Sequence, residues 1–392
     1  MTRKLAILGG TPAFEAPLHV GRPSLPDRAA LHRSIDQILD RQWITNDGPV
    51  VREFEERIAE RVGVRHCVAT SSGTSAIEIL LAADGGTDGY LCPAFTFVAT
   101  AAAASWIGQD PILVDSSPTS PNISADEAIA ECAGRSVSGL LAVHVWGDPV
   151  SASEMQRVET EVGCPVMFDA AHAFGVRRKG TPVGREGLAS VFSFHATKIV
   201  QSIEGGAIVT DDDGLAADLR SLRNFGFSGY DVVDRRGING KMNEFEAAMG
   251  LLSLDQLDRV IDHNHELHEA YGEELLALAG VDLFRHADDV EPTHHYIVAI
   301  VDSGTAPLER DQLWLALTAE NVLARRYFSP GLHRFADYEG FASRPLPNAD
   351  RWAAACLALP TGRSVTVEAA HRIGQLVAEI WHEAASLPRH VK

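Results

Sequence analysis

Short apolar stretches alternate with amphipathic segments over the first half of the chain. Residues 51–62 place Phe54, Ile58 and Val62 at helical spacing, with charged residues between them. Other stretches read as short apolar strands, the first two each followed by a helix: HCVATSSGTSAIEILLAA, YLCPAFTFVATAAAASWIG, DPILVDSS, GLLAVHVWG, CPVMFDAAHAFG, SVFSFHATK and GGAIVTDD. Strands that alternate with helices between residues ~50 and ~210 predict an α/β fold with a mostly parallel sheet covered on both faces.

The pattern changes near residue 250. LLSLDQLDRVIDHNHELHEAYGEELLALAG predicts one long amphipathic helix that leads into a second domain. THHYIVAIVDS alternates as a strand does, and residues 310–324 and 366–384 have helical periodicity. We therefore expect a large α/β domain over residues 1–250, including the N-terminal segment, and a smaller α+β domain over residues 251–392.

Composition and charge exclude several classes of function. The formal net charge is −19 and the acidic residues are spread along the chain, which argues against binding to nucleic acid or to an anionic membrane surface. The five cysteines form no CxxC pair and suggest a reducing compartment. The first apolar stretch is too short for a signal peptide and no later segment is long enough to span a membrane, so we expect a cytoplasmic protein.

One histidine-rich run has the spacing of a metal site. HNHELH, from His263 to His268, lies in the predicted long helix, where we interpret it as a solvated face and expect no metal. A zinc enzyme is thus a weaker alternative than the chemistry indicated by the four features below.

Two of these features follow predicted strands early in the chain. SSGTSA places Gly73 and Thr74 between a strand and a helix, where small residues let backbone N–H groups approach a phosphate. The same residues also fit a plain turn with a helix cap. Phe97, in PAFTFVAT, follows the next strand and can stack on a flat heterocycle, although an aromatic residue there also fits the core.

The other two features are a carboxylate and a lysine. Asp169 directly follows the apolar strand residues of MFDAAHAFG, where a partly buried charge requires a cationic partner such as a protonated pyridine nitrogen. A helix cap is the alternative. Lys198, in SFHATKIVQSIEGGA, follows another strand among small polar residues, so burial can lower its pKa and let it form a Schiff base. Ser193, five residues earlier, can bind phosphate. Together the four features indicate pyridoxal phosphate.

Taken in order, SGTSA, PAFTFVAT, DAAHAFG, SFHATK with EGGA, and GINGKMNEFEAAMG resemble the DegT/DnrJ/EryC1/StrS family of sugar aminotransferases. The resemblance extends from WITNDGPVVREFEE to YFSPGLH and implies the pyridoxal-phosphate-dependent fold type I of aspartate aminotransferase. It makes Lys198 the residue that carries the cofactor, Asp169 the partner of the pyridine nitrogen and Phe97 the stacking ring. It also implies phosphate contacts, from Gly73, Thr74 and Ser193.

The resemblance assigns the remaining site residues as well. Asn239 matches an asparagine that reaches the cofactor phosphate of the neighbouring subunit, which implies a homodimer with shared active sites. His172 stands where many members have glutamine, beside the cofactor's phenolic oxygen, so the way that oxygen is held departs from the usual pattern. Segments that border the sugar-nucleotide site supply the expected substrate-binding residues Trp43, Thr45, Glu204, Tyr327 and His333.

The implied reaction moves the amino group of L-glutamate to a nucleotide-linked keto sugar. His172 together with SFHATK most resembles the subgroup that converts dTDP-4-keto-6-deoxy-D-glucose to dTDP-4-amino-4,6-dideoxy-D-glucose. Alternatives within the family are enzymes acting on C3-keto sugars or cyclitols, and sugar dehydratases, which typically have histidine in place of Lys198. A regulator that binds sugar nucleotides without catalysis is the alternative from a different class.

Overall fold

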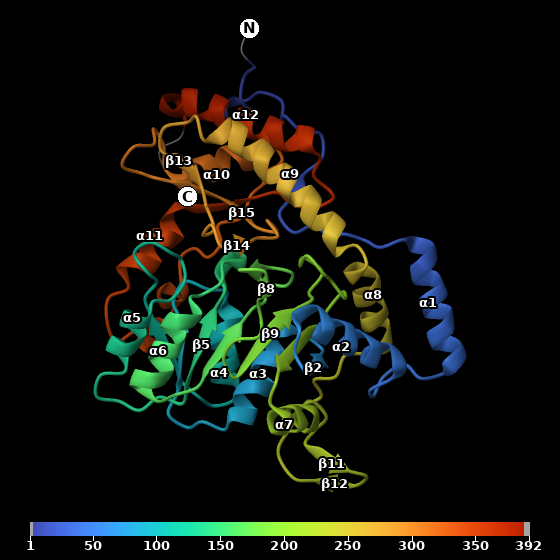
Figure 1. Ribbon diagram of the computed structural model, residues 1–392. Helices are drawn as coiled ribbons and strands as arrows, with labels where there is room; N and C mark the ends of the chain where they lie inside the picture. The colour runs from blue at the N-terminus through green and yellow to red at the C-terminus, as the bar shows by residue number, and fades with distance from the viewer. Residues whose placement is uncertain (1–2, 388–392) are drawn as a thin grey trace.

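The computed structural model describes residues 3–387, and a seven-stranded sheet lies at its centre (Figure 1). The strand order is β2-β10-β9-β6-β5-β3-β4. The strands are β2 (His66–Thr70), β3 (Tyr90–Pro93), β4 (Pro111–Val114), β5 (Gly139–Val143), β6 (Val166–Asp169), β9 (Ala189–Ser193) and β10 (Gly206–Thr210). β10 runs antiparallel to β2 and β9, and the other neighbouring pairs are parallel. The predicted mostly parallel sheet is confirmed.

Helices cover both faces of this sheet. They are α2 (Pro49–Val62), α3 (Gly73–Asp84), α4 (Val98–Trp106), α5 (Ala125–Glu131), α6 (Ala152–Val162), α7 (Asp213–Arg223) and α8 (Glu244–Leu254). Successive side chains of a strand point to opposite faces. In β10, Val209 packs in the cluster that contains Phe54 of α2, and Ile208 packs in the cluster that contains Leu80 of α3. This two-sided burial explains why the strands read as continuous apolar runs.

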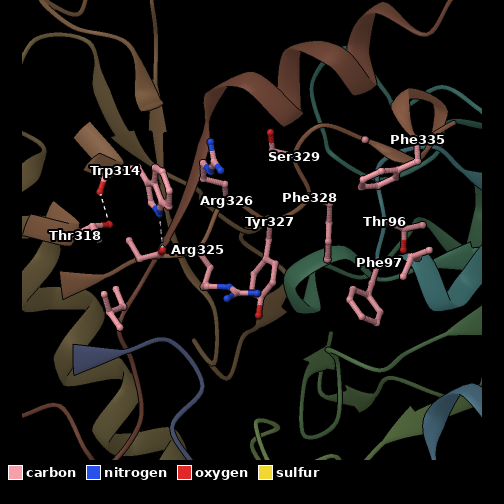
Figure 2. Close-up of a pocket in the computed structure, with 14 residues that line it drawn as sticks. Thr96, Phe97, Trp314, Thr318, Arg325, Arg326, Tyr327, Phe328, Ser329 and Phe335 are labelled. Atoms are coloured by element: carbon pink, nitrogen blue, oxygen red, sulfur yellow. Dashed lines mark hydrogen bonds between the residues drawn. The ribbon is translucent and has the colours of Figure 1, made fainter. Parts of the chain in front are cut away.

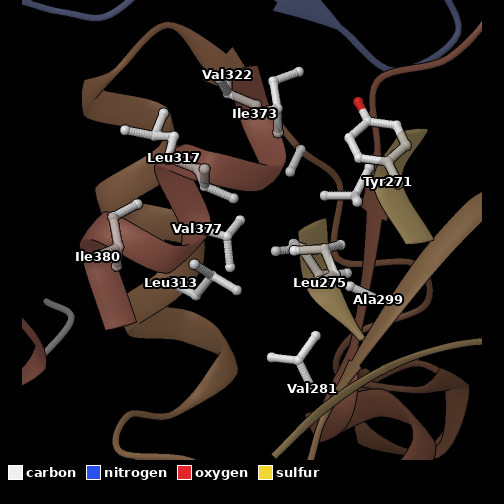
Figure 3. Packing of buried hydrophobic residues seen from close by; sticks show 14 of the residues in the cluster. Tyr271, Leu275, Val281, Ala299, Leu313, Leu317, Val322, Ile373, Val377 and Ile380 are labelled. Carbon is white, nitrogen blue, oxygen red and sulfur yellow. The ribbon is translucent and has the colours of Figure 1, made fainter. Parts of the chain in front are cut away.

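The C-terminal half adds a smaller antiparallel sheet packed against helices. The strands β13 (Val281–Leu283), β15 (Ile297–Val301) and β17 (Cys356–Leu359) lie beside α9 (Leu257–Leu275), α10 (Arg310–Ala319) and α12 (Val367–His382). Figure 3 shows the core between them, where Tyr271, Leu313 and Val377 are fully or almost fully buried. α10 ends before the predicted limit of residue 324, because Asn321 adopts a positive φ of 62°.

The first described residues, from residue 3 onward, pack against this C-terminal part. Leu5 belongs to the same core cluster, and the buried Glu320 accepts hydrogen bonds from the N–H groups of Ala6 and Ala13 at 2.7 Å each. β1 (Leu18–His19) pairs in parallel with β16 (Val322–Leu323). The domain boundary near residue 250 stays a prediction. These contacts show that the N-terminal segment packs on residues that lie after that boundary.

The single long helix expected after residue 250 is wrong, because the chain forms two helices there. α8 ends at Leu254 and α9 begins at Leu257. α8 packs against α1 (Arg28–Arg41) and α2, whereas α9 packs against α12. A turn between the helices lets each pack against its own partner.

The remaining strands and α-helix are β7 (Arg177–Arg178), β8 (Thr181–Pro182), β11 (Phe227–Gly229), β12 (Val232–Val233), β14 (Val290–Glu291) and α11 (Pro347–Ala355).

The interpretation of HNHELH as a solvated face is also wrong. His263, 24% exposed, bonds through Nε2 to the carbonyl of Val365 at 2.8 Å, and the ring of His268 stacks on His294 with centroids 3.9 Å apart. These histidines are half-buried because α9 lies between α12 and the loop before β15. Within residues 3–387 there is no cluster of His, Cys, Asp and Glu side chains suited to hold a metal ion. No helix in that range is both long and apolar enough to cross a membrane.

Candidate active site

A cavity of about 500 Å³ opens where the carboxyl ends of the central strands meet the C-terminal part of the chain. It is the place where parallel-sheet folds concentrate polar side chains. The cavity brings together most of the residues selected from the sequence: Gly73, Thr74, Phe97, Asp169, His172, Ser193, Lys198, Glu204 and Tyr327. They come from segments up to 254 residues apart, so their convergence is a property of the fold.

Lys198 lies in the loop that follows β9. Its Nζ donates a hydrogen bond to the hydroxyl of Tyr296 at 3.2 Å and lies 5.7 Å from the centre of the same ring. Burial lowers the pKa of Lys198 to about 8, and the negative charge of Asp169 acts in the opposite direction. A substantial fraction of the amine is therefore unprotonated just above neutral pH, as a nucleophile requires.

Asp169 ends β6 and is 6% exposed. Its Oδ2 accepts a hydrogen bond from the Thr100 hydroxyl at 2.8 Å, and its Oδ1 accepts one from the backbone N–H of Ala171 at 3.1 Å. Burial raises the pKa of Asp169, while these two donors and Lys198 act against that rise. No helix begins directly after Asp169, so the helix-cap alternative does not apply. The carboxylate instead faces the cavity.

His172 is held as a neutral imidazole. Its Nδ1 accepts a hydrogen bond from the backbone N–H of Trp146 at 3.3 Å. Burial holds the pKa of His172 well below its usual range, and Lys198 lowers it further. A neutral ring whose Nδ1 is an acceptor carries its proton on Nε2. The ring centroid lies 4.4 Å from that of Tyr296, so aromatic packing fixes this donor at the cavity wall.

The N-terminus of α3 forms another wall of the cavity. The first N–H groups of a helix have no partner within the helix and attract anions. Ser72 caps the helix through its side chain, which accepts from Ser75 N, and leaves Gly73 and Thr74 at the cavity. A Cβ on Gly73 would lie 3.0 Å from Cβ of Ser193, so glycine allows this close approach of helix and strand.

The outer part of the cavity carries aromatic rings and one contact between a histidine and a carboxylate. Phe97 precedes α4 and is 54% exposed. The ring centroids of Phe97 and Phe328 are 6.5 Å apart. The ring of Tyr327 lies 6.0 Å from that of Tyr296. Glu204 lies in the connection between β9 and β10. Its Oε1 is 3.6 Å from Nε2 of His195.

Four expected residues do not line this cavity: Trp43, Thr45, Asn239 and His333. Trp43 is 42% exposed and has the Arg52 guanidinium over its ring, and Thr45 is half-buried two residues later. Asn239 is exposed and forms an isolated bridge with Asn224. His333 turns away to bond Asp350 at 2.8 Å.

Residue-level reasoning on the sequence missed two residues that line the cavity, Tyr296 and Arg325, and one that bonds Asp169 from behind it, Thr100. Thr100 had a detectable signal, because PAFTFVAT places two threonines four residues apart, and Thr96 Oγ1 indeed lies 3.1 Å from Thr100 Oγ1. Tyr296 had none, since its alternating strand also fits a core residue. Arg325 follows an apolar segment and gives no sign of its position in the cavity.

The fold and this cavity define an aminotransferase. The chain belongs to the DegT/DnrJ/EryC1/StrS aminotransferase family, whose model matches residues 27–378. It is 32% identical over 365 residues to an Escherichia coli dTDP-4-amino-4,6-dideoxy-D-glucose transaminase, covering 91% of this chain and 97% of the relative. A GDP-perosamine synthase of Caulobacter vibrioides is 30% identical, with coverages of 84% and 90%.

A solved structure agrees with this assignment. DesI, crystallised in the presence of its TDP-sugar product, is 43% identical and superposes with a TM-score of 0.93, covering 97% of both chains. The predicted family and fold type I are confirmed.

Proposed function

We propose that this protein uses pyridoxal phosphate to move the amino group of L-glutamate to a nucleotide-linked keto sugar. The proposed acceptor is dTDP-4-keto-6-deoxy-D-glucose, which would become dTDP-4-amino-4,6-dideoxy-D-glucose. The names of the two transaminase relatives, from Escherichia coli and Shigella dysenteriae, support this choice, as does the TDP-sugar product of DesI.

The observation that carries the proposal is the convergence of Lys198 and Asp169 in one cavity. Lys198 would hold the cofactor covalently, and Asp169 is a buried carboxylate that fits a protonated ring nitrogen. The α3 N-terminus with Thr74 and Ser193 fits a phosphate group. Pyridoxal phosphate, when bound, supplies an electron sink for the carbanion that forms during amino-group transfer.

The side chains around this centre have separate tasks. With its pKa near 8, Lys198 is suited to take a proton from a carbon acid and return it. His172, neutral and with a proton on Nε2, donates a hydrogen bond into the cavity toward an oxygen of the bound group. Phe97 provides an exposed aromatic face for stacking. Glu204 and Tyr327 border the remaining space, where the sugar would bind.

We propose a homodimer in which each active site contains residues from both chains. The support is the surface around Asn239, where the β11–β12 hairpin projects from the body of the molecule (Figure 1). Tyr230 on this hairpin is 97% exposed, Val233 is 56% exposed and Ile238 beside it is 41% exposed. Exposed apolar groups of this size mark interaction surfaces. Asn239, Trp43 and Thr45 would complete the partner's site.

The proposal is tested by incubating the purified protein with L-glutamate and a panel of keto sugars. The panel contains dTDP-linked 4-keto and 3-keto sugars, a GDP-linked 4-keto sugar and a keto cyclitol. We expect release of 2-oxoglutarate with the dTDP-linked 4-keto sugar, and NMR of the product should place nitrogen on C4.

Nitrogen on C3, or preference for another panel member, would overturn the proposed substrate but leave the aminotransferase. Absence of a cofactor absorbance band together with absence of turnover would favour the non-catalytic regulator. The Lys198→Ala variant serves as the blank for background deamination.

A further inference from the structure

A second hollow adjoins the active-site cavity. It has a volume of about 510 Å³ and extends toward α10 and the segment 323–335 (Figure 2). The two hollows share a wall built from Thr96, Phe97, Leu323, Arg325, Tyr327 and Phe328. We call the second hollow the outer groove. Phe335 at one end and Trp314 at the other give it aromatic walls.

Two neighbouring arginines line the outer groove, and their surroundings differ. Arg326 forms an ion pair with Asp311 at 3.2 Å and lies 3.9 Å above the ring of Trp314. Arg325 is exposed, and within the described range of residues no carboxylate lies within 4 Å of it. In Figure 2 its guanidinium lies beside Tyr327, whose ring centre is 5.5 Å from Cζ. The charge of Arg325 is therefore not neutralised by the chain.

The position of Arg325 suits its unpaired charge to binding an anion. It lines both hollows, and among the described residues it is the only arginine of the active-site cavity. The chain as a whole carries a net charge of −19, so an anionic substrate needs a local cation to bind there. A guanidinium presents donors in a fork that matches phosphate and carboxylate oxygens.

We propose that Arg325 binds an oxyanion of the substrate where the two hollows meet. The inference rests on the proposed function and extends it. A nucleotide-linked sugar has two bulky ends joined by a diphosphate. With the sugar in the active-site cavity and the nucleoside in the outer groove, the diphosphate lies at Arg325. A carboxylate of the amino donor has the same chemistry and is the other source of the anion.

Calorimetric titration of the holoenzyme separates these sources without requiring turnover. The probes are dTDP, which carries the diphosphate and nucleoside alone, and glutarate, which carries the two carboxylates of the donor without its amine. Each is titrated into the wild-type protein, Arg325→Gln, Arg325→Lys and the control Arg344→Gln, because Arg344 lines neither hollow and pairs with Glu127 at 3.5 Å. Thermal melting confirms that each variant folds, and the backbone bond from Arg325 N to the Ala358 carbonyl survives substitution.

We expect Arg325→Gln to weaken dTDP binding about 10-fold to 100-fold, as the loss of a charged hydrogen-bond partner does. Arg325→Lys should recover part of the loss, because it restores the charge without the fork. Arg344→Gln should bind dTDP nearly as the wild type does.

Loss of glutarate binding alone would assign the oxyanion site to the amino donor and remove the nucleoside from the outer groove. Unchanged binding of both probes to Arg325→Gln, or equal losses in Arg325→Gln and Arg344→Gln, would overturn the inference. Neither result affects the keto-sugar assay, so failure of this inference is distinct from failure of the proposed function.

Discussion

Two groups of expected functional residues differ in how completely one chain places them. Asp169 and Ser193 end central strands and Lys198 follows one, and the three meet in one cavity, where Asp169 is only 6% exposed. Trp43 and Asn239 lie on exposed segments, outside this cavity. The sheet fixes the positions of the first group, because strand register and burial restrict where a residue at the end of a strand can lie. The second group lines no part of this cavity within the described residues.

In the proposed homodimer, this difference separates the residues that one chain positions by itself from those that the partner chain would supply. If the account is correct, substitutions of Asp169 or Lys198 inactivate the site of their own chain. Substitutions in the exposed group, Trp43 and Asn239, instead damage the site of the neighbouring chain. The following predictions test the two groups in turn.

Replacing Lys198 with alanine should have the largest effect. The loss of the amine removes both the covalent attachment of the cofactor and the group that moves protons, so we expect turnover to fall by about 10⁴-fold or more. The measurement is 2-oxoglutarate release from glutamate. Lys179→Ala is the control, because the side chain of Lys179 is 78% exposed and its Nζ lies 3.8 Å from Asp289, outside the cavity. Equal losses in both variants would mean that Lys198 has no special role.

Asp169→Asn should keep the fold and slow turnover by roughly 10³-fold to 10⁴-fold. The amide has almost the same shape, and its oxygen can still accept the hydrogen bond from Thr100, but the charge proposed to pair with the ring nitrogen is lost. Steady-state kinetics and a thermal melt together check this result. Near-normal turnover by Asp169→Asn would leave the carboxylate a purely structural group.

Mixing two inactive variants tests the exposed group. Lys198→Ala chains are combined with Asn239→Asp chains, in which a carboxylate would oppose the neighbour's phosphate. With shared sites, a mixed dimer has one doubly damaged site and one intact site. Random mixing makes half of the dimers mixed, so activity should return toward about a quarter of normal for a two-fold dimer.

Subunit exchange in that mixture is verified by mass spectrometry. Exchange without recovery would show that Asn239 acts within its own chain or not at all, and the comparison between the two groups would then lose its explanation.

Tyr296→Phe should have the smallest effect and refines the description of Lys198. Phenylalanine keeps the ring beside Nζ but removes the oxygen that accepts its hydrogen bond. The protonated amine loses a partner, so the pKa of Lys198 should fall further below about 8.

The rate at which the apoprotein takes up pyridoxal phosphate covalently depends on the free amine and should rise with pH. Its midpoint should lie near pH 8 in the wild-type protein and lower in Tyr296→Phe. A midpoint that is unchanged or higher in the variant would mean that the hydroxyl does not stabilise the protonated amine.

Sequence patterns predicted the sheet well because its strands are buried on both faces and read as apolar runs. They also selected residues such as Asp169 and Lys198, whose polar character stands out directly after such runs. Tyr296 was not selectable, because a tyrosine in an alternating strand has the same pattern whether it packs or binds a lysine. The break between α8 and α9 was missed, since helical periodicity continues across it and only the different packing partners of the two helices require a turn.

The account depends most on one covalent assignment, that Lys198 holds the cofactor. The direct measurement is borohydride reduction of the purified protein, followed by proteolysis and peptide mass mapping. We expect a yellow protein whose colour is lost on reduction and a single pyridoxyl label on the peptide that contains Lys198. A label on Lys179 or Lys241 instead, or no label on a protein that still transfers amino groups, would contradict the account.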